Sequence, residues 1–124
     1  MGKYDAYIDS WRRRLASRRE ERQAHIQQLR AAAGECARFL GSQSGASRVY
    51  LFGSLVRDSA PFHEASDIDL AVEGLASEAY MTALTRVWEL VPPGVQVDLV
   101  PLESASPELR KRVLEEGRLL YERE

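Results

Sequence analysis

Apolar residues along the first third of the chain recur with the period of an α-helix. Residues 4 to about 41 contain no proline, and their apolar side chains are spaced by threes and fours, which predicts one long helix with an apolar face. Between Leu15 and Ile26 the same positions hold Arg18 and Arg22. We therefore expect the second half of the helix to pack on a folded body, while the first half either projects or folds back. The apolar positions are Tyr4, Ile8, Trp11, Leu15, Ile26, Leu29, Ala33, Cys36 and Leu40.

Beyond this helix the pattern changes to short strands that alternate with helices. A helix is predicted from an N-cap at Ser77 to Leu90, and another from an N-cap at Ser106, with Pro107 in its first turn, to Gly117. This order predicts an α/β (α+β) fold, in which helices flank a small mixed β-sheet. The predicted strands are residues 48–52, 67–73, 95–100 and 118–122.

The charged residues divide the chain into a basic and an acidic part. Its 124 residues suffice for one domain with a single core, which we place at 45–124, preceded by a helical arm for docking or oligomerisation at 1–44. Residues 1–38 hold nine Lys and Arg against five Asp and Glu, whereas the rest hold eight against fourteen. Such an arm could meet nucleic acid or an acidic partner, although arginines in a helix more often form a solvated face.

Composition excludes several classes of protein. No apolar run is long enough to cross a bilayer and no signal-peptide pattern is present, so we expect a cytoplasmic protein without a membrane partner. The single cysteine, Cys36, excludes an internal disulfide and a cysteine metal site. The only lysines are Lys3 and Lys111, which excludes a Gly-Lys-Ser/Thr phosphate loop. The histidines, His25 and His63, form no evident Ser-His-Asp set.

Carboxylates interrupt two of the predicted strands. Asp67 and Asp69 stand two residues apart and therefore share one face of their strand, and Asp98 lies within the strand 95–100. If these strands pair, all three carboxylates meet, because neighbouring strands lie about 5 Å apart. Like charges so placed repel unless cations compensate, and Mg²⁺ completed by phosphate oxygens suits such ligands. A strand aspartate that merely faces water is the simpler alternative.

A Gly-Ser turn ends the first predicted strand. Gly53 lets the backbone approach a ligand, free N–H groups at a helix start attract phosphate, and the Ser54 hydroxyl adds a donor. Arg57 could reach the same anion. Each feature alone is common, but together with the carboxylates they predict a nucleoside triphosphate held beside two Mg²⁺ ions.

The combination LFGSLVRD…SDIDLAV…VDLV resembles the minimal nucleotidyltransferases of the DNA polymerase β superfamily. The resemblance implies the polymerase β-like fold and a Mg²⁺-dependent transfer of NMP from an NTP. It implies that Gly53 and Ser54 contact the nucleotide and that Asp67 and Asp69 bind Mg²⁺. Asp98 would complete the metal site and orient or deprotonate the acceptor hydroxyl.

The resemblance covers about residues 46–122, with one departure. Twelve residues separate Ser54 from Asp67, more than we expect for this family, so a longer loop beside the site is predicted. The placement of Arg57 depends on that loop. His63, also within it, is expected to face solvent.

The resemblance also implies an acceptor. Stand-alone members are often paired with a small all-helical partner of the HEPN type, commonly an RNase toxin, and attach AMP, with ATP as donor, to a tyrosine of that partner. Tyr4, Tyr7 and Trp11 would suit docking to it, or a homo-oligomer, unless they pack back on their own domain. Other functions stay open: nucleotidylation of a small molecule such as an aminoglycoside, a catalytically silent nucleotide- or partner-binding module, and RNA binding by the arginine-rich helix.

Overall fold

The computed structural model describes residue 2 and residues 4–56 and 67–124, with Asp67 described by its backbone alone. The predicted order of strands and helices is confirmed, and the third strand starts one residue later than predicted. In chain order the elements are α1 (Asp5–Ser42), β1 (Arg48–Phe52), the 3₁₀ turn η1 (Gly53–Val56), β2 (Asp67–Glu73), the 3₁₀ turn η2 (Ser77–Ala79), α2 (Tyr80–Leu90), β3 (Gln96–Pro101), the 3₁₀ turn η3 (Leu102–Ser104), α3 (Pro107–Glu116) and β4 (Arg118–Glu122).

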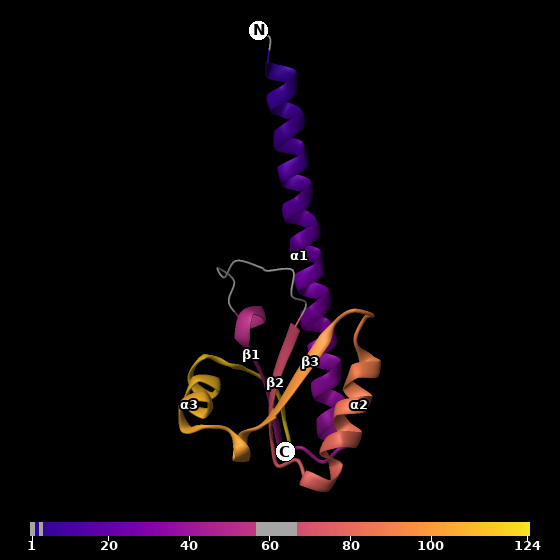
Figure 1. Ribbon diagram of the computed structural model, residues 1–124, viewed down its shortest axis with the longest axis vertical. Coiled ribbons are helices and arrows are strands. Elements are labelled where there is room, and N and C mark those ends of the chain that lie inside the picture. The colour runs from indigo at the N-terminus through magenta and orange to yellow at the C-terminus, as the bar shows by residue number, and fades with distance from the viewer. Residues whose placement is uncertain (1, 3, 57–66) are drawn as a thin grey trace.

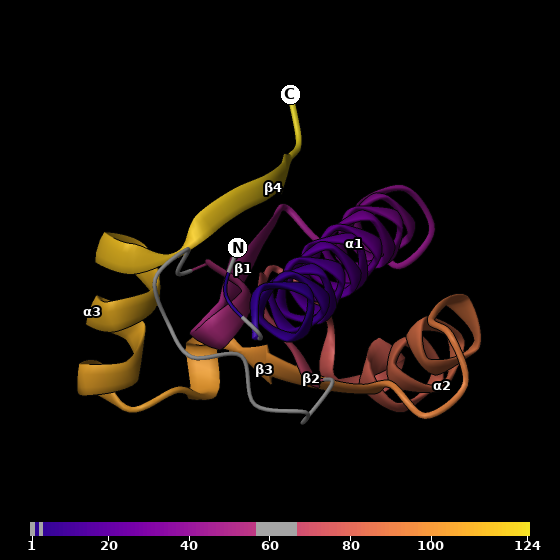
Figure 2. The same ribbon diagram turned by 90° about the horizontal axis from the view of Figure 1, so that it is seen from above.

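The four strands form one mixed sheet in the order β3-β2-β1-β4. β1 is antiparallel to β2 and β4, whereas β2 and β3 are parallel and are joined through α2, since parallel neighbours need a crossover connection. Helices α1 and α2 cover one face and α3 lies on the other (Figures 1 and 2). The larger core, under α1 and α2, includes Val49, Leu51, Ile68, Leu70, Leu29 and Leu40, and the smaller one, under α3, includes Ala71, Leu102 and Val113.

Helix α1 packs on the sheet by its C-terminal half only. Its buried residues all lie within Leu29–Gly41, whereas every residue of Tyr4–Ala24 is exposed except the half-buried Leu15. The N-terminal half therefore projects beyond the body (Figure 1), and the side chain of Trp11 is 58% exposed. None of the described helices is long and apolar enough to cross a membrane.

One predicted helix cap is present and one is not. The Ser106 hydroxyl accepts a hydrogen bond from the Leu109 N–H at 3.2 Å, as expected for an N-cap at the start of α3. The predicted N-cap at Ser77 is wrong. Ser77 is the first residue of η2, so a 3₁₀ turn separates it from the free backbone N–H groups at the start of α2. Ala79 occupies the N-cap position of α2, and no side chain caps the helix there.

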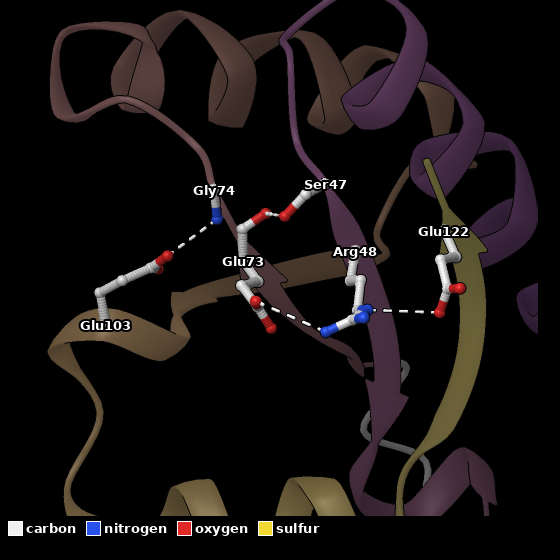
Figure 3. Close-up of polar contacts among 6 residues, drawn as sticks. All are labelled: Ser47, Arg48, Glu73, Gly74, Glu103 and Glu122. Carbon is white, nitrogen blue, oxygen red and sulfur yellow. Dashed lines mark hydrogen bonds and ion pairs between the residues drawn. The ribbon is translucent and has the colours of Figure 1, made fainter. Parts of the chain in front are cut away.

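Polar contacts tie the strands together at the end of the sheet where β1 begins (Figure 3). Arg48 lies opposite Glu73 on β2 and Glu122 on β4, and its guanidinium contacts them at 3.6 Å and 3.3 Å. The Gly74 N–H donates to the Glu103 carboxylate at 2.8 Å. These contacts are largely exposed and individually weak, but they join three strands at the end away from the η1 turn.

Candidate active site

The register of the two parallel strands brings two of the predicted carboxylates together. Asp69 of β2 lies directly opposite Asp98 of β3, and paired strands lie about 5 Å apart. Ile68 and Leu70, which alternate with Asp69, are buried beneath α1 and α2. The two carboxylates therefore share the opposite face of the sheet, at the end where β2 begins.

The turn after β1 lies against one of these carboxylates. Gly53 has a φ of +82°, a conformation that side chains other than glycine's rarely adopt, and a β-carbon built on it would strike Oδ2 of Asp69. The β1–β2 register, which pairs Phe52 with Asp69, accounts for this proximity. Glycine is thus favoured here both by the backbone conformation and by the carboxylate behind it.

Helix α1 holds the turn in place from the other side. The Arg30 Nε donates to the backbone carbonyl of Leu55 at 2.9 Å, and the Leu55 side chain is buried in the core. Ser54, between Gly53 and Leu55, is exposed. The backbone of η1 is therefore fixed while the Ser54 hydroxyl remains accessible to a ligand.

A cavity of about 390 Å³ lies beside the two carboxylates. Asp69 and Asp98 contribute to its wall together with the aromatic rings of Tyr80 and Trp88 from α2 and the side chain of Leu109 from α3. Asp98 is exposed and lies on β3, the edge strand. A group that entered this cavity would contact both Asp98 and the apolar and aromatic side chains that line the cavity beside it.

The aromatic rings of α2 also cap the edge of the sheet. Trp88 Nε1 donates to the Val97 carbonyl at 3.1 Å, and the Tyr80 hydroxyl donates to the Leu99 carbonyl at 2.7 Å. Both carbonyls belong to the edge strand, where unsatisfied backbone groups would otherwise invite a further strand. We therefore expect an acceptor to reach Asp98 as a side chain or small molecule, and not as an added strand.

A second cavity, of about 290 Å³, lies beside Gly53. One of its lining residues is Arg112, a positively charged side chain that the sequence did not single out. Leu109, Arg112 and Glu116 of α3 line the cavity together with Gly53. Their spacing of three and four places them on one helix face, which was the available signal. A guanidinium beside the Gly53 turn is suited to a phosphate group.

Three of the predicted residues cannot be placed in this arrangement. Arg57 and His63 lie outside the described residues, and so does the side chain of Asp67. Among the described side chains, no third His, Cys, Asp or Glu joins Asp69 and Asp98 in a metal-binding group. Adjacent carboxylates nevertheless fit a hard divalent cation such as Mg²⁺, which takes one or two carboxylates and completes its shell with phosphate and water.

Comparisons with known proteins identify the family of this fold. The family model of the polymerase β nucleotidyltransferases matches residues 35–124. A solved minimal nucleotidyltransferase is 32% identical, with a TM-score of 0.60, over 74% of this chain and 92% of that one. The complex of a tri-AMPylated HEPN toxin from Shewanella oneidensis with its MNT antitoxin gives 26% identity and a TM-score of 0.56, over 77% and 73% of the two chains. A toxin–antitoxin structure with AMP-PNP is 25% identical, with a TM-score of 0.54, over 80% of this chain and 74% of that one.

The chain belongs to the polymerase β nucleotidyltransferase family and contains a domain of the minimal, MNT type. Nucleotidyl transfer is accordingly its activity. A comparison with curated proteins gives no significant match. The family match begins within α1, so the projecting half of that helix lies outside it.

Proposed function

We propose that the protein transfers AMP from ATP to a tyrosine hydroxyl of a small helical partner of the HEPN type, as the antitoxin of a toxin–antitoxin pair. The observation that carries the proposal is the register that sets Asp69 beside Asp98, with Gly53 against Asp69. The similar complexes support the choice of donor and acceptor, because one contains AMP-PNP and another an AMPylated HEPN toxin with its MNT antitoxin.

The carboxylates have distinct roles in this proposal. Asp69 and Asp98 provide hard oxygen ligands for Mg²⁺, and Asp67, two residues from Asp69 on the same strand, is the third proposed ligand. Two bound Mg²⁺ ions would neutralise charge on the phosphates and align attacking and leaving oxygens. Asp98, on the edge strand, orients the acceptor hydroxyl and accepts its proton.

The η1 turn and α3 hold the nucleotide. Gly53 and Ser54 offer backbone N–H groups and a hydroxyl to the triphosphate, and Arg112 faces the same cavity as Gly53. Arg57 is a further proposed contact of the triphosphate. A bond forms between the acceptor oxygen and the α-phosphorus, the bond from that phosphorus to the bridging oxygen breaks, and pyrophosphate leaves. Positioning and charge neutralisation account for most of the catalysis.

Nucleotide binding can be tested by thermal unfolding with Mg²⁺ and each of ATP, GTP, CTP and UTP. A ligand at a hundredfold excess over its Kd adds about 2.7 kcal/mol to the free energy of unfolding, which raises Tm by several degrees. We expect this shift with ATP in wild type and its loss in Asp69→Asn and Asp98→Asn. The control is Glu73→Gln, which removes a carboxylate four residues along the same face of β2 and should keep the shift. An unchanged shift in both aspartate variants would contradict the assigned site.

Transfer can be tested with ATP labelled at the α-phosphate, Mg²⁺ and a purified HEPN-type protein. We expect label on a tyrosine of that protein, seen by mass spectrometry as one added AMP, and none with Asp98→Asn. Labelling of an aminoglycoside in place of the protein would replace the proposed acceptor by a small molecule. Nucleotide binding without transfer to either acceptor would refute the acceptor assignment but not the nucleotide site.

A further inference from the structure

The projecting half of α1 carries an exposed apolar patch. We call residues 4–24 the arm, and we call its five large apolar residues the arm patch. Tyr7 is 74% exposed, Ile8 44% and Trp11 58%. The arm is about 30 Å long, and a helix of this length without tertiary packing is only marginally stable in water. The arm patch consists of Tyr4, Tyr7, Ile8, Trp11 and Leu15.

Arginines continue the stripe that the arm patch begins. Arg18 and Arg22 occupy the next positions of the three-and-four pattern, between Leu15 and Ile26. Arg14, Arg18 and Arg22 also follow one another at intervals of four, so their guanidinium groups are neighbours along the helix and repel, and Glu21, three residues beyond Arg18, offsets only part of that repulsion. Carboxylates supplied from outside would relieve this repulsion, whereas an apolar surface would bury the charges unpaired.

The orientation of α1 determines where a molecule bound to the arm lies. The arm patch lies on the same helix face as Leu29, because the spacing that places Leu29 in the core runs unbroken from Trp11. Figure 1 shows the arm rising past the end of the sheet at which β1 ends and β2 begins. Gly53 follows β1 directly and Asp69 lies near the start of β2. A molecule covering this stripe is thus held beyond the catalytic end of the sheet.

We propose that the arm binds an acidic helix with an apolar stripe, presented by the partner protein that carries the acceptor hydroxyl. The apolar stripe of that helix covers the arm patch, and its carboxylates meet Arg18 and Arg22. The arm then increases the local concentration of the acceptor at the site. This inference rests on the proposed function, because it requires the acceptor to be a protein.

A second copy of the chain fits this surface less well. In a parallel pair of arms, the arginine row of one helix would face the same row of the other. An antiparallel pair overlapping at the tips would cover both arm patches but leave Arg18 and Arg22 outside the contact. Nucleic acid also fits less well, because the arm mixes six arginines with four carboxylates and its tip is apolar.

The probe for this surface is a synthetic amphipathic helix of about four heptads, with leucine at a and d and glutamate at e and g. A second probe has lysine in place of each glutamate. Binding of both labelled probes to the full chain is measured by fluorescence anisotropy. Arg22→Glu should weaken binding of the glutamate probe about tenfold and strengthen that of the lysine probe. Trp11→Ala should weaken binding of both, because it removes the largest apolar contact of the arm patch.

The matched control is Arg13→Glu, which makes the same charge change on the opposite side of the same helix. It should alter binding of either probe by less than about twofold. Equal effects of the two arginine variants, or equal binding of the two probes to wild type, would overturn the proposal. So would tighter binding of single-stranded RNA, or self-association in sedimentation that Trp11→Ala abolishes. The ATP-induced Tm shift, measured on each variant, should persist. Its absence in wild type would instead count against the proposed function.

Discussion

Replacing Gly53 by alanine tests whether the η1 turn positions Asp69, the proposed catalytic carboxylate. Two positions of the chain allow a matched comparison, because Gly53 and Gly94 have nearly the same backbone conformation, with φ of +82° and +87°. A β-carbon at Gly94 would meet no atom within 4 Å, whereas one at Gly53 would strike Oδ2 of Asp69. The two variants therefore share the backbone strain and differ in the displaced carboxylate.

The expected effects can be estimated separately for stability and activity. An alanine in the left-handed region costs about 1–2 kcal/mol, and the reduced entropy of the unfolded chain offsets roughly 0.4–1 kcal/mol of that. Both variants should thus lose about 1 kcal/mol, which lowers Tm by a few degrees. The Asp69 carboxylate is the free end of a short side chain, so it can turn away from the new methyl group at small cost in stability. A displacement of about 1 Å at a reacting centre can nevertheless reduce the rate about a hundredfold.

The assay combines thermal unfolding with the rate of AMP transfer at saturating ATP and Mg²⁺. We expect similar losses of Tm in Gly53→Ala and Gly94→Ala, and a loss of transfer of about a hundredfold in Gly53→Ala alone. A Gly53→Ala protein that transfers AMP at the wild-type rate would refute the assignment of Gly53 and Asp69 to one site. A similar loss in Gly94→Ala would show that the rate follows general stability instead.

Two further predictions concern α3 and the core. Arg112→Gln should weaken ATP binding several-fold, because it removes a guanidinium beside the Gly53 turn. Arg110→Gln, on the same helix but outside that cavity, should leave ATP binding unchanged. Equal ATP-induced Tm shifts in the two variants would contradict a role for Arg112 in binding the phosphates. Burial raises the pKa of the Cys36 thiol to about 11, above the ordinary thiol value of 9.0. The buried neutral thiol therefore stabilises the fold fully below pH 9 and progressively less toward pH 11, so wild type should lose more stability than Cys36→Ala over that range in denaturant titrations. Parallel losses would exclude a contribution from Cys36.

The order and type of the elements could be predicted because the hydrophobic period changes clearly along the chain. Strand β2 occupies the predicted residues, since its apolar run is bounded on both sides by turn-forming residues. The start of α2 could not be predicted to the residue. Ser77 has the chemistry of an N-cap, but η2 separates it from α2, and the choice between a 3₁₀ turn and an α-helical turn depends on tertiary packing.

The candidate site could be predicted only as far as neighbouring residues of one strand determine it. The period of two in a strand places Asp67 and Asp69 on one face whatever the rest of the fold does. That Asp69 lies opposite Asp98 depends on the order and register of β2 and β3, which the sequence leaves open. Arg112 depends on still more, because it reaches the Gly53 cavity only through the packing of α3 against the face that carries Phe52.

The projection of the arm has a physical cause that the spacing alone did not reveal. Apolar residues continue at helical intervals along almost the whole of α1, so periodicity is equally consistent with a helix that folds back on the sheet. Burial nevertheless ends where Arg18 and Arg22 enter the stripe, since packing these guanidinium groups against an apolar core would leave two charges unpaired. The same two residues therefore oppose further packing of α1 on its own domain, and in the proposed complex they would meet the carboxylates of the partner helix.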